Sequence, residues 1–337
     1  MMQIAYCRPV IPTQPRPLLP EMFRDQSSFQ ATIEAAAEQL GISATAVEKD
    51  YWVSQVLRIL TDRFPLDFIF KGGTSLSKGY GMIERFSEDI DLLIIPGGKG
   101  RGAVDRLMKD IAASAGECLG SVPETVGSGH GKHRECRIEY PTSRMGNSAI
   151  ETSVLLEMGV RGGPEPSEHV EMRMLLADAL VAAGTNVSAY SDLRSFNVKV
   201  LHPGRTLLEK LYAIHAEAMR LSRDADATVK ARMGRHFYDV SKLLGRDDVE
   251  EFLAESDTLD EILREIEEIS IENFGAHEYQ ELRPDGGFRS SPVFEPSSDV
   301  SQRVRAVYES DMEELYFGSD PLPSWDDICR QVAASTV

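Results

Sequence analysis

Two aspartates separated by a single residue, Asp89 and Asp91, lead into the apolar run at residues 92–95. The run is rich in Leu and Ile and predicts a β-strand. On a strand, residues i and i+2 point to the same face, so the two carboxylates lie about 6.6 Å apart along one side of the backbone. Carboxylates at this spacing can converge on metal ions held about 3.5–4 Å apart. The pair therefore predicts a site for divalent cations.

A glycine pair precedes the aspartates and follows another short apolar strand, at residues 68–70. Gly72 and Gly73 supply a turn in which the backbone can approach a ligand closely. Thr74 and Ser75 stand where a helix N-cap is expected, with free N–H groups and the positive end of the helix dipole. Such a corner binds anions, phosphate above all. A phosphate cradle beside paired aspartates is the equipment for phosphoryl or nucleotidyl transfer.

This order of motifs resembles the nucleotidyltransferase superfamily of the DNA polymerase β type. The finer pattern, Lys-Gly-Gly-Thr-Ser-Leu at 71–76 and Arg-Phe-Ser-Glu-Asp-Ile-Asp-Leu at 85–92, is similar to the AbiEii/AbiGii toxin family. The resemblance implies transfer of a nucleoside monophosphate from an NTP with Mg²⁺, for which Mn²⁺ can substitute. The nucleotide-binding residues expected from these motifs are Lys71, Gly72, Gly73, Thr74, Ser75 and Ser87, together with Lys210 from a later motif.

The family supplies toxins of two-gene toxin–antitoxin and phage-defence systems, and several members are thought to act on tRNA 3′ ends. The resemblance therefore implies an RNA acceptor, with tRNA as the first candidate, and an antitoxin encoded by a neighbouring gene. Two alternatives stay open from the sequence. The acceptor can be a protein or an antibiotic hydroxyl, or the chain can be a nucleotide-binding regulatory module without turnover.

A third carboxylate is expected on a neighbouring strand. Residues 154–160 predict a buried strand that is interrupted by Glu157. An ionised Glu in an apolar strand is costly unless it is paired or bound to metal. The superfamily resemblance implies such a third metal ligand beside Asp89 and Asp91, and Glu157 is our choice. Glu151 is the runner-up, with Glu139 behind it.

Two further charges belong to the helical second half of the chain. Lys210 and Asp239 each lie at the edge of an apolar stripe with the 3–4 spacing of a helix. The stretches Thr-Leu-Leu-Glu-Lys and Arg-His-Phe-Tyr-Asp that end at these residues resemble two later motifs of the toxin family. The resemblance implies that Lys210 holds a phosphate oxygen, and that Asp239 activates the acceptor hydroxyl or orders Lys210. The expected catalytic residues are Asp89, Asp91, Lys210 and Asp239.

The elements that must position these residues predict an α/β fold. We expect a nucleotidyltransferase domain with a mixed β-sheet and flanking helices over residues 23–204, and then a mainly α-helical domain over residues 205–337 that closes the active-site cleft. The proline-rich residues 1–22 are expected to form an extended arm. We also predict a loop-rich segment at 121–148 and a helix at 170–183.

Two smaller expectations concern local detail. Thr206 is predicted to cap the helix that carries Lys210. In the predicted helix at 45–60, the charged residues Lys49 and Asp50 have two interpretations: they are solvated charges of a packing helix, or one of them leans toward the nucleotide.

Composition limits the remaining possibilities. The 337 residues carry a net charge of −18, which argues against a protein that coats nucleic acid non-specifically. RNA contact then requires a local basic region, and the expected RNA-binding residues are Lys132, Arg134 and Arg137, with Arg205, Arg232 and Arg235 in reserve. No apolar run is long enough to span a membrane, and the start does not resemble a signal peptide. The four cysteines lie far apart, so a reduced cytoplasm is expected.

Overall fold

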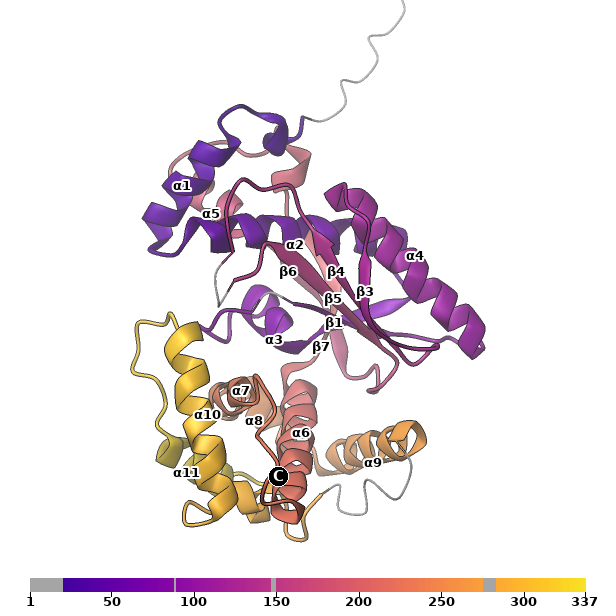
Figure 1. Cartoon of the computed structure of the whole chain (residues 1–337), viewed down its shortest axis with the longest axis vertical. Helices are drawn as coiled ribbons and strands as arrows, with labels where there is room; N and C mark the ends of the chain where they lie inside the picture. The colour runs from indigo at the N-terminus through magenta and orange to yellow at the C-terminus, as the bar shows by residue number, and fades with distance from the viewer. Residues whose placement is uncertain (1–20, 88, 147–149, 275–282) are drawn as a thin grey trace, which may run out of the picture.

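The computed structural model describes residues 21–87, 89–146, 150–274 and 283–337, so the expected arm at 1–22 lies almost wholly outside it. A seven-stranded mixed sheet has the strand order β3-β4-β5-β2-β1-β7-β6 (Figure 1). The strands are β1 (Phe68–Lys71), β2 (Ile90–Ile94), β3 (Glu124–Gly129), β4 (His133–Glu139), β5 (Ser153–Gly159), β6 (Ser167–Met172) and β7 (Phe196–Leu201). The chain is thus a mixed α/β protein, as the sequence predicts.

Helices surround this sheet. Those of the first half are α1 (Phe29–Leu40), α2 (Ala44–Arg63), α3 (Gly72–Thr74), α4 (Arg101–Leu119) and α5 (Leu175–Ala182). From Pro203 on, the named elements are all helical: α6 (Pro203–Arg223), α7 (Gly234–Leu244), α8 (Asp247–Ala254), α9 (Ser256–Phe274), α10 (Asp299–Leu315) and α11 (Trp325–Ala334), with short 3₁₀ turns at Phe288–Ser290 and Pro292–Phe294. No helix in the described parts of the chain has both the length and the apolar character needed to cross a bilayer.

The two faces of the sheet have different partners. Alternate strand residues such as Phe70, Leu92 and Leu156 pack with α1, α2, α4 and α5 into one hydrophobic core. The residues between them point to the other face, where apolar cover is limited to a small cluster around Ile69 and Leu93. Helices α6 to α11 gather below the sheet in Figure 1 and build a second core, to which Leu76, Met82 and Ile83 of the first half also belong. Polar side chains on the second face therefore have room to meet the helical half.

Two helices begin at other residues than predicted, each for a local reason. Helix α6 begins at Pro203, where a proline fits the first helical position, and His202 accepts a hydrogen bond from the Gly204 N–H. Thr206 lies inside the helix and does not cap it. Residues 167–172 form the edge strand β6, paired antiparallel with β7, so the helix predicted from 170 starts only at Leu175.

The segment predicted as loop-rich at 121–148 contains a β-hairpin, β3–β4, that extends the sheet beyond β5. Its glycines and its run of charges conceal the two-residue period of a strand. Arg134 consequently points into the packed face, where its guanidinium contacts the Asp105 carboxylate at 3.2 Å and the Thr125 hydroxyl. Arg137 lies on the opposite face and is paired at 3.3 Å with the exposed Glu151. The predicted RNA-binding residues thus do not share one surface, and Arg134 is a packing residue.

This assignment predicts different outcomes for two arginines of one strand. Arg134→Ala should lower the melting temperature by several degrees, because it removes a buried side chain that bonds Thr125 and Asp105 and leaves Lys109 to pair with Asp105. Arg137→Ala removes a half-exposed ion pair and should leave the melting temperature almost unchanged. Thermal unfolding followed by circular dichroism compares the two variants directly. Equal melting temperatures would contradict the buried role of Arg134.

Candidate active site

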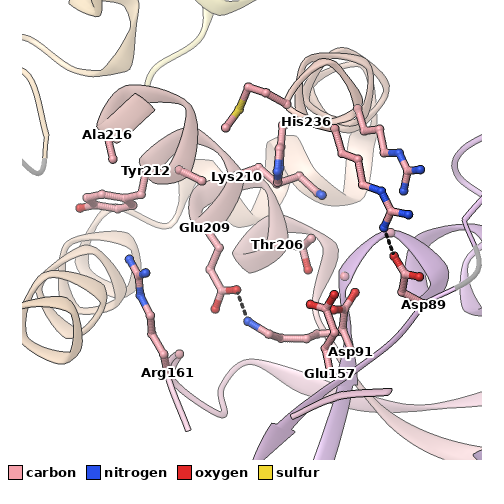
Figure 2. Close-up of a pocket in the computed structure, with 18 of the residues that line it drawn as sticks. Asp89, Asp91, Glu157, Arg161, Thr206, Glu209, Lys210, Tyr212, Ala216 and His236 are labelled. Carbon is pink, nitrogen blue, oxygen red and sulfur yellow. Dashed lines mark hydrogen bonds and ion pairs between the residues drawn. The ribbon is translucent and has the colours of Figure 1, made fainter. Parts of the chain in front are cut away.

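A cavity of about 490 Å³ lies between the second face of the sheet and helices α6, α7 and α9 (Figure 2). Its charge differs from that of the chain as a whole, because among the residues that the structure describes seven Lys or Arg line it against four Asp or Glu. The cations are Lys71, Arg85, Arg161, Lys210, Lys230, Arg232 and Arg235, and the acids are Asp89, Asp91, Glu157 and Glu209. A chain with a net charge of −18 thus concentrates positive charge around one cavity.

Two of the acids form a close pair. Asp91 of β2 and Glu157 of β5 are direct neighbours in the parallel register of these strands, and their side chains share a hydrogen bond. Burial, and then the charge of Asp89, raises the pKa of Asp91. Burial and the charges of Asp91 and Asp89 raise the pKa of Glu157. Two buried carboxylates in contact are therefore unfavourable as a doubly charged pair, which a proton or a cation would relieve. Glu157, rather than Glu151 or Glu139, is the carboxylate that lies against Asp91.

Asp89 is close to this pair but is engaged elsewhere. It lies one residue before β2 begins, and its Oδ2 atom contacts the Arg232 guanidinium at 3.0 Å. Among the residues that the structure describes, no three His, Cys, Asp or Glu side chains are arranged as a ready metal site. The Asp91–Glu157 pair offers only oxygen ligands, which suits Mg²⁺ or Mn²⁺. Asp89 can complete that set if its carboxylate turns away from Arg232.

The glycine turn leaves no room for side chains. Gly72 adopts a φ of +78°, and a Cβ atom there would lie 1.9 Å from Oδ2 of Asp91. A Cβ atom on Gly73 would lie 2.5 Å from Nη2 of Arg85 and 2.7 Å from Oγ of Ser87. The two glycines therefore let the backbone pass directly against the Asp91 carboxylate and the Arg85 guanidinium. The close approach of this backbone to a ligand stays a prediction.

The short helix at this turn begins three or four residues earlier than predicted. It starts at Gly72, with Lys71 at the N-cap position. Thr74 and Ser75 are buried below the cavity wall. The Thr74 hydroxyl bonds to the Ser87 hydroxyl at 2.9 Å, and the Ser75 hydroxyl donates to the Gly72 carbonyl at 2.9 Å. Of these hydroxyls only that of Ser87 belongs to a residue lining the cavity. A direct contact of the Thr74 or Ser75 side chain with nucleotide stays a prediction.

Asp239 forms ion pairs with two cations from distant parts of the chain. It is fully buried on α7 and accepts two hydrogen bonds of 2.7 Å from Arg85, through Nε and Nη2. The Lys210 ammonium of α6 lies 2.8 Å from its Oδ2 atom. Burial alone would raise the pKa of Asp239, but Arg85 and Lys210 outweigh it and hold that pKa well below its usual range. Such a saturated carboxylate is better suited to ordering Lys210 than to accepting a proton from an acceptor hydroxyl.

Arg85 is the residue of this site whose role the sequence did not reveal. Its only signal was its place in the Arg-Phe-Ser motif at 85–87, ahead of the aspartates. Its side chain is 3% exposed and lines the cavity above Gly73. It therefore connects the glycine turn to Asp239.

Lys71 also bridges the two halves of the protein. Its Nζ atom, at the end of β1, lies 2.8 Å from Oε2 of Glu209 on α6. Lys71 thus lines the cavity, with its charge shared by a carboxylate of the helical half, and its contact with nucleotide stays a prediction.

Other candidate residues lie away from the cavity. Lys132, Arg134 and Arg137 are not among the residues lining it. Neither are Lys49 and Asp50. Lys49 donates to the Glu151 carbonyl, and Asp50 accepts from Lys78 and from the Leu175 N–H. Both residues support packing, so the second interpretation of them, a lean toward the nucleotide, finds no support in the geometry.

A mixed sheet that carries this arrangement on its open face is of the α/β nucleotidyltransferase type. The chain belongs to the family described as nucleotidyl transferase AbiEii toxin, type IV toxin–antitoxin system, whose family model matches residues 56–331. It is therefore a nucleotidyltransferase, as the motifs predict, and the family implies an antitoxin partner. A search of curated proteins found no match to the chain.

Asp239→Asn should destabilise the fold strongly, because it leaves Arg85 and Lys210 facing each other without a buried anion. Loss of one partner from a buried ion pair costs about 3–5 kcal/mol. Lys210→Met should cost less, since Arg85 still neutralises Asp239. The folded pKa lies below the unfolded value of about 3.9, so this stabilisation is present above about pH 4 and is lost only as the pH falls through the folded value. Urea unfolding of the three proteins at pH 7 measures the difference, and equal stabilities would refute the charge cluster.

Gly72→Ala should abolish nucleotidyl transfer, because the new methyl group displaces the Asp91 carboxylate. Gly81→Ala is the matched control, since Gly81 has a φ of +62° but no described atom lies within 4 Å of the position that its new methyl group would take. Both variants carry the backbone cost of about 1–2 kcal/mol for a left-handed residue. Only the first should also lose activity, as measured by incorporation of labelled nucleotide at matched folded fractions. Equal activity in the two variants would show that the close approach is not needed.

Proposed function

We propose that the chain transfers a nucleoside monophosphate from an NTP to an RNA acceptor, the 3′ end of tRNA, in a reaction that depends on Mg²⁺ or Mn²⁺. The observation that carries this proposal is the reversal of charge, from a net −18 for the chain to a cavity with more cations than anions. A local positive field draws polyanions into a cleft. The carboxylate pair at the same site supplies what a cation bridging phosphates would need.

Each part of the site has a role in this proposal. Asp89, Asp91 and Glu157 would hold the cation, which supplies charge neutralisation at the reacting phosphoryl group. The backbone at Gly72 lies against Asp91, and that at Gly73 against Arg85, where a triphosphate can approach it. Lys210 offers a point charge to a phosphate oxygen, and Asp239 fixes its direction. Alignment and charge stabilisation suffice for this chemistry, so no covalent intermediate on the protein is needed.

The proposal also assigns roles to the two halves. Residues 23–204 form the nucleotidyltransferase domain, and residues 205–337 form a helical domain that closes the cleft. This division is supported by the cavity lining, because β1, β2 and β5 supply one wall and α6, α7 and α9 the other. We further propose a phage-defence role in the cytoplasm and an antitoxin encoded by a neighbouring gene.

The acceptor is proposed to enter along the rim formed by Lys230, Arg232 and Arg235. The side chains of Lys230 and Arg232 are 64% and 48% exposed and line the cavity, so they can meet a bulky polyanion at its mouth. Arg205 does not belong to this rim, because it is buried against Glu265. Lys132 and Arg137 remain candidates for a more distant RNA contact.

The test is incorporation of each labelled NTP into bulk tRNA, with and without EDTA. Glu157→Gln and Asp91→Asn should each reduce incorporation by about 100-fold or more, since each weakens a contact to the cation. Glu139→Gln is the matched control, because Glu139 is exposed on β4 and lies outside the cavity lining. It should keep full activity.

Other results would redirect the proposal. Label appearing in protein rather than in tRNA would assign a protein acceptor. Full activity of Glu157→Gln, or activity that persists in EDTA, would overturn the proposed metal site.

A further inference from the structure

The three carboxylates proposed to hold the cation are not gathered in one place. Asp91 and Glu157 are neighbours in the register of β2 and β5, whereas Asp89 lies apart from them, as Figure 2 shows. The Oδ2 atom of Asp89 accepts a hydrogen bond of 3.0 Å from Nη1 of Arg232, which follows 143 residues later in the chain. An acid proposed as a cation ligand is thus held by a permanent positive charge.

The backbone that carries Arg232 is strained. A hydrogen bond of 3.3 Å from the Met233 N–H to the Lys230 carbonyl closes a four-residue turn, and Arg232 is the third residue of this turn. Its φ is +65°, and among the residues that the structure describes it is the one non-glycine residue with a positive φ. Gly or Asn is the usual residue at a third turn position with positive φ. Strained residues cluster at ligand clamps and switch regions, so the arginine side chain itself is the feature to explain.

Both ends of this turn are anchored to neighbouring helices. The Lys230 N–H donates to Oε1 of Glu217 on α6 at 2.9 Å. The Gly234 N–H donates to Oδ2 of Asp311 on α10, also at 2.9 Å. These bonds fix the backbone on either side of Arg232 and maintain its strained conformation. The long side chain of Arg232 is therefore the part of the turn that can change its partner.

The ion pair has one partner inside the cavity and one at its rim. The side chain of Asp89 is 15% exposed, and that of Arg232 is 48% exposed. An ion pair this open to water is weak, because water screens it and the long side chain loses freedom. A phosphate at the rim can compete for the guanidinium, since it accepts the same two-pronged contact as a carboxylate. Asp89 is then free to turn toward Asp91 and Glu157.

We propose that Arg232 is a positioning residue, which keeps Asp89 away from the cation site until a phosphate of the RNA acceptor replaces Asp89 as its partner. This inference rests on the proposed function and adds to it the order in which the site is completed. Without acceptor the cation site has two carboxylates, and with acceptor it has three. An NTP that binds without acceptor then meets an incomplete site, which limits its hydrolysis by water. Acceptor and cation consequently strengthen the binding of each other.

The first measurement is binding of Mn²⁺ to the full chain without RNA, followed by the paramagnetic signal of free Mn²⁺. Arg232→Asn should bind Mn²⁺ about 5-fold more tightly than the wild type, because Asp89 no longer has to leave a partner. Asparagine tolerates the positive φ, and Arg232→Gly, which suits it best, is the second variant. Lys230→Asn is the matched control, since Lys230 pairs at 3.5 Å with Glu217 rather than with Asp89. Its Mn²⁺ affinity should stay within about 2-fold of the wild type.

The second measurement is binding of bulk tRNA in EDTA, so that no divalent cation contributes. Asp89→Asn releases Arg232 and should bind tRNA about 5-fold more tightly than the wild type. The same substitution in an Arg232→Asn background should give no gain, because no guanidinium is left to release. This comparison isolates the pair, since the through-space effect of deleting one negative charge persists in both backgrounds. Inorganic triphosphate, titrated in parallel, should not show a gain that depends on Arg232.

The outcomes separate this inference from the proposed function. Melting temperatures close to that of the wild type verify that the variants are folded. Unchanged or weaker Mn²⁺ binding by Arg232→Asn and Arg232→Gly would overturn the role of Arg232, and so would a gain from Asp89→Asn that persists without the guanidinium. A gain confined to triphosphate would overturn the acceptor as the partner. In each of these cases, binding of Mn²⁺ and tRNA by the wild type still upholds the proposed function. If the wild type binds neither, both fail together.

Discussion

The buried carboxylate of Asp239 is the interaction on which the arrangement of the site depends. An ion that is removed from water is tolerated only when partners of excellent geometry surround it. Here those partners are Arg85, which is 154 residues away in sequence, and Lys210 on the adjacent helix. Satisfying Asp239 therefore fixes the position of α7 relative to α6 and to the segment after the glycine turn. The Phe86 N–H reinforces the same junction by donating to the Leu315 carbonyl.

Several parts of this site could be predicted because their signals are local. The glycine turn, the spaced aspartates and the isolated Glu157 in an apolar run can each be recognised within a few residues. Strand alternation then does bring Glu157 beside Asp91, as the register shows. Arg85 could not be predicted in the same way, because its meaning lies in a contact with a helix that forms much later in the chain. No periodic pattern records such a contact.

The position of the basic residues could not be predicted from the sequence. Net charge correctly indicates that cations must be concentrated locally, but it does not say where. The charged run around Arg134 was the densest in sequence, yet strand geometry sends every second residue of that run to the packed face. The actual concentration of cations is assembled in three dimensions, from a strand end, a turn, two helices and the segment before α7. A polyanion that binds here would meet the density of cations in space, not their density along the sequence.

The division of the cavity between two halves also bears on how the protein is made in the cell. During translation the sheet, with its carboxylates and glycine turn, is complete before Lys210 and Asp239 have left the ribosome. Until they emerge, Arg85 has no buried anion to hold it and the site lacks its lysine. A partly synthesised or prematurely terminated chain therefore lacks a complete site. Because α9 also lines the cavity, the complete site can form only after residue 270 of the 337 has been made.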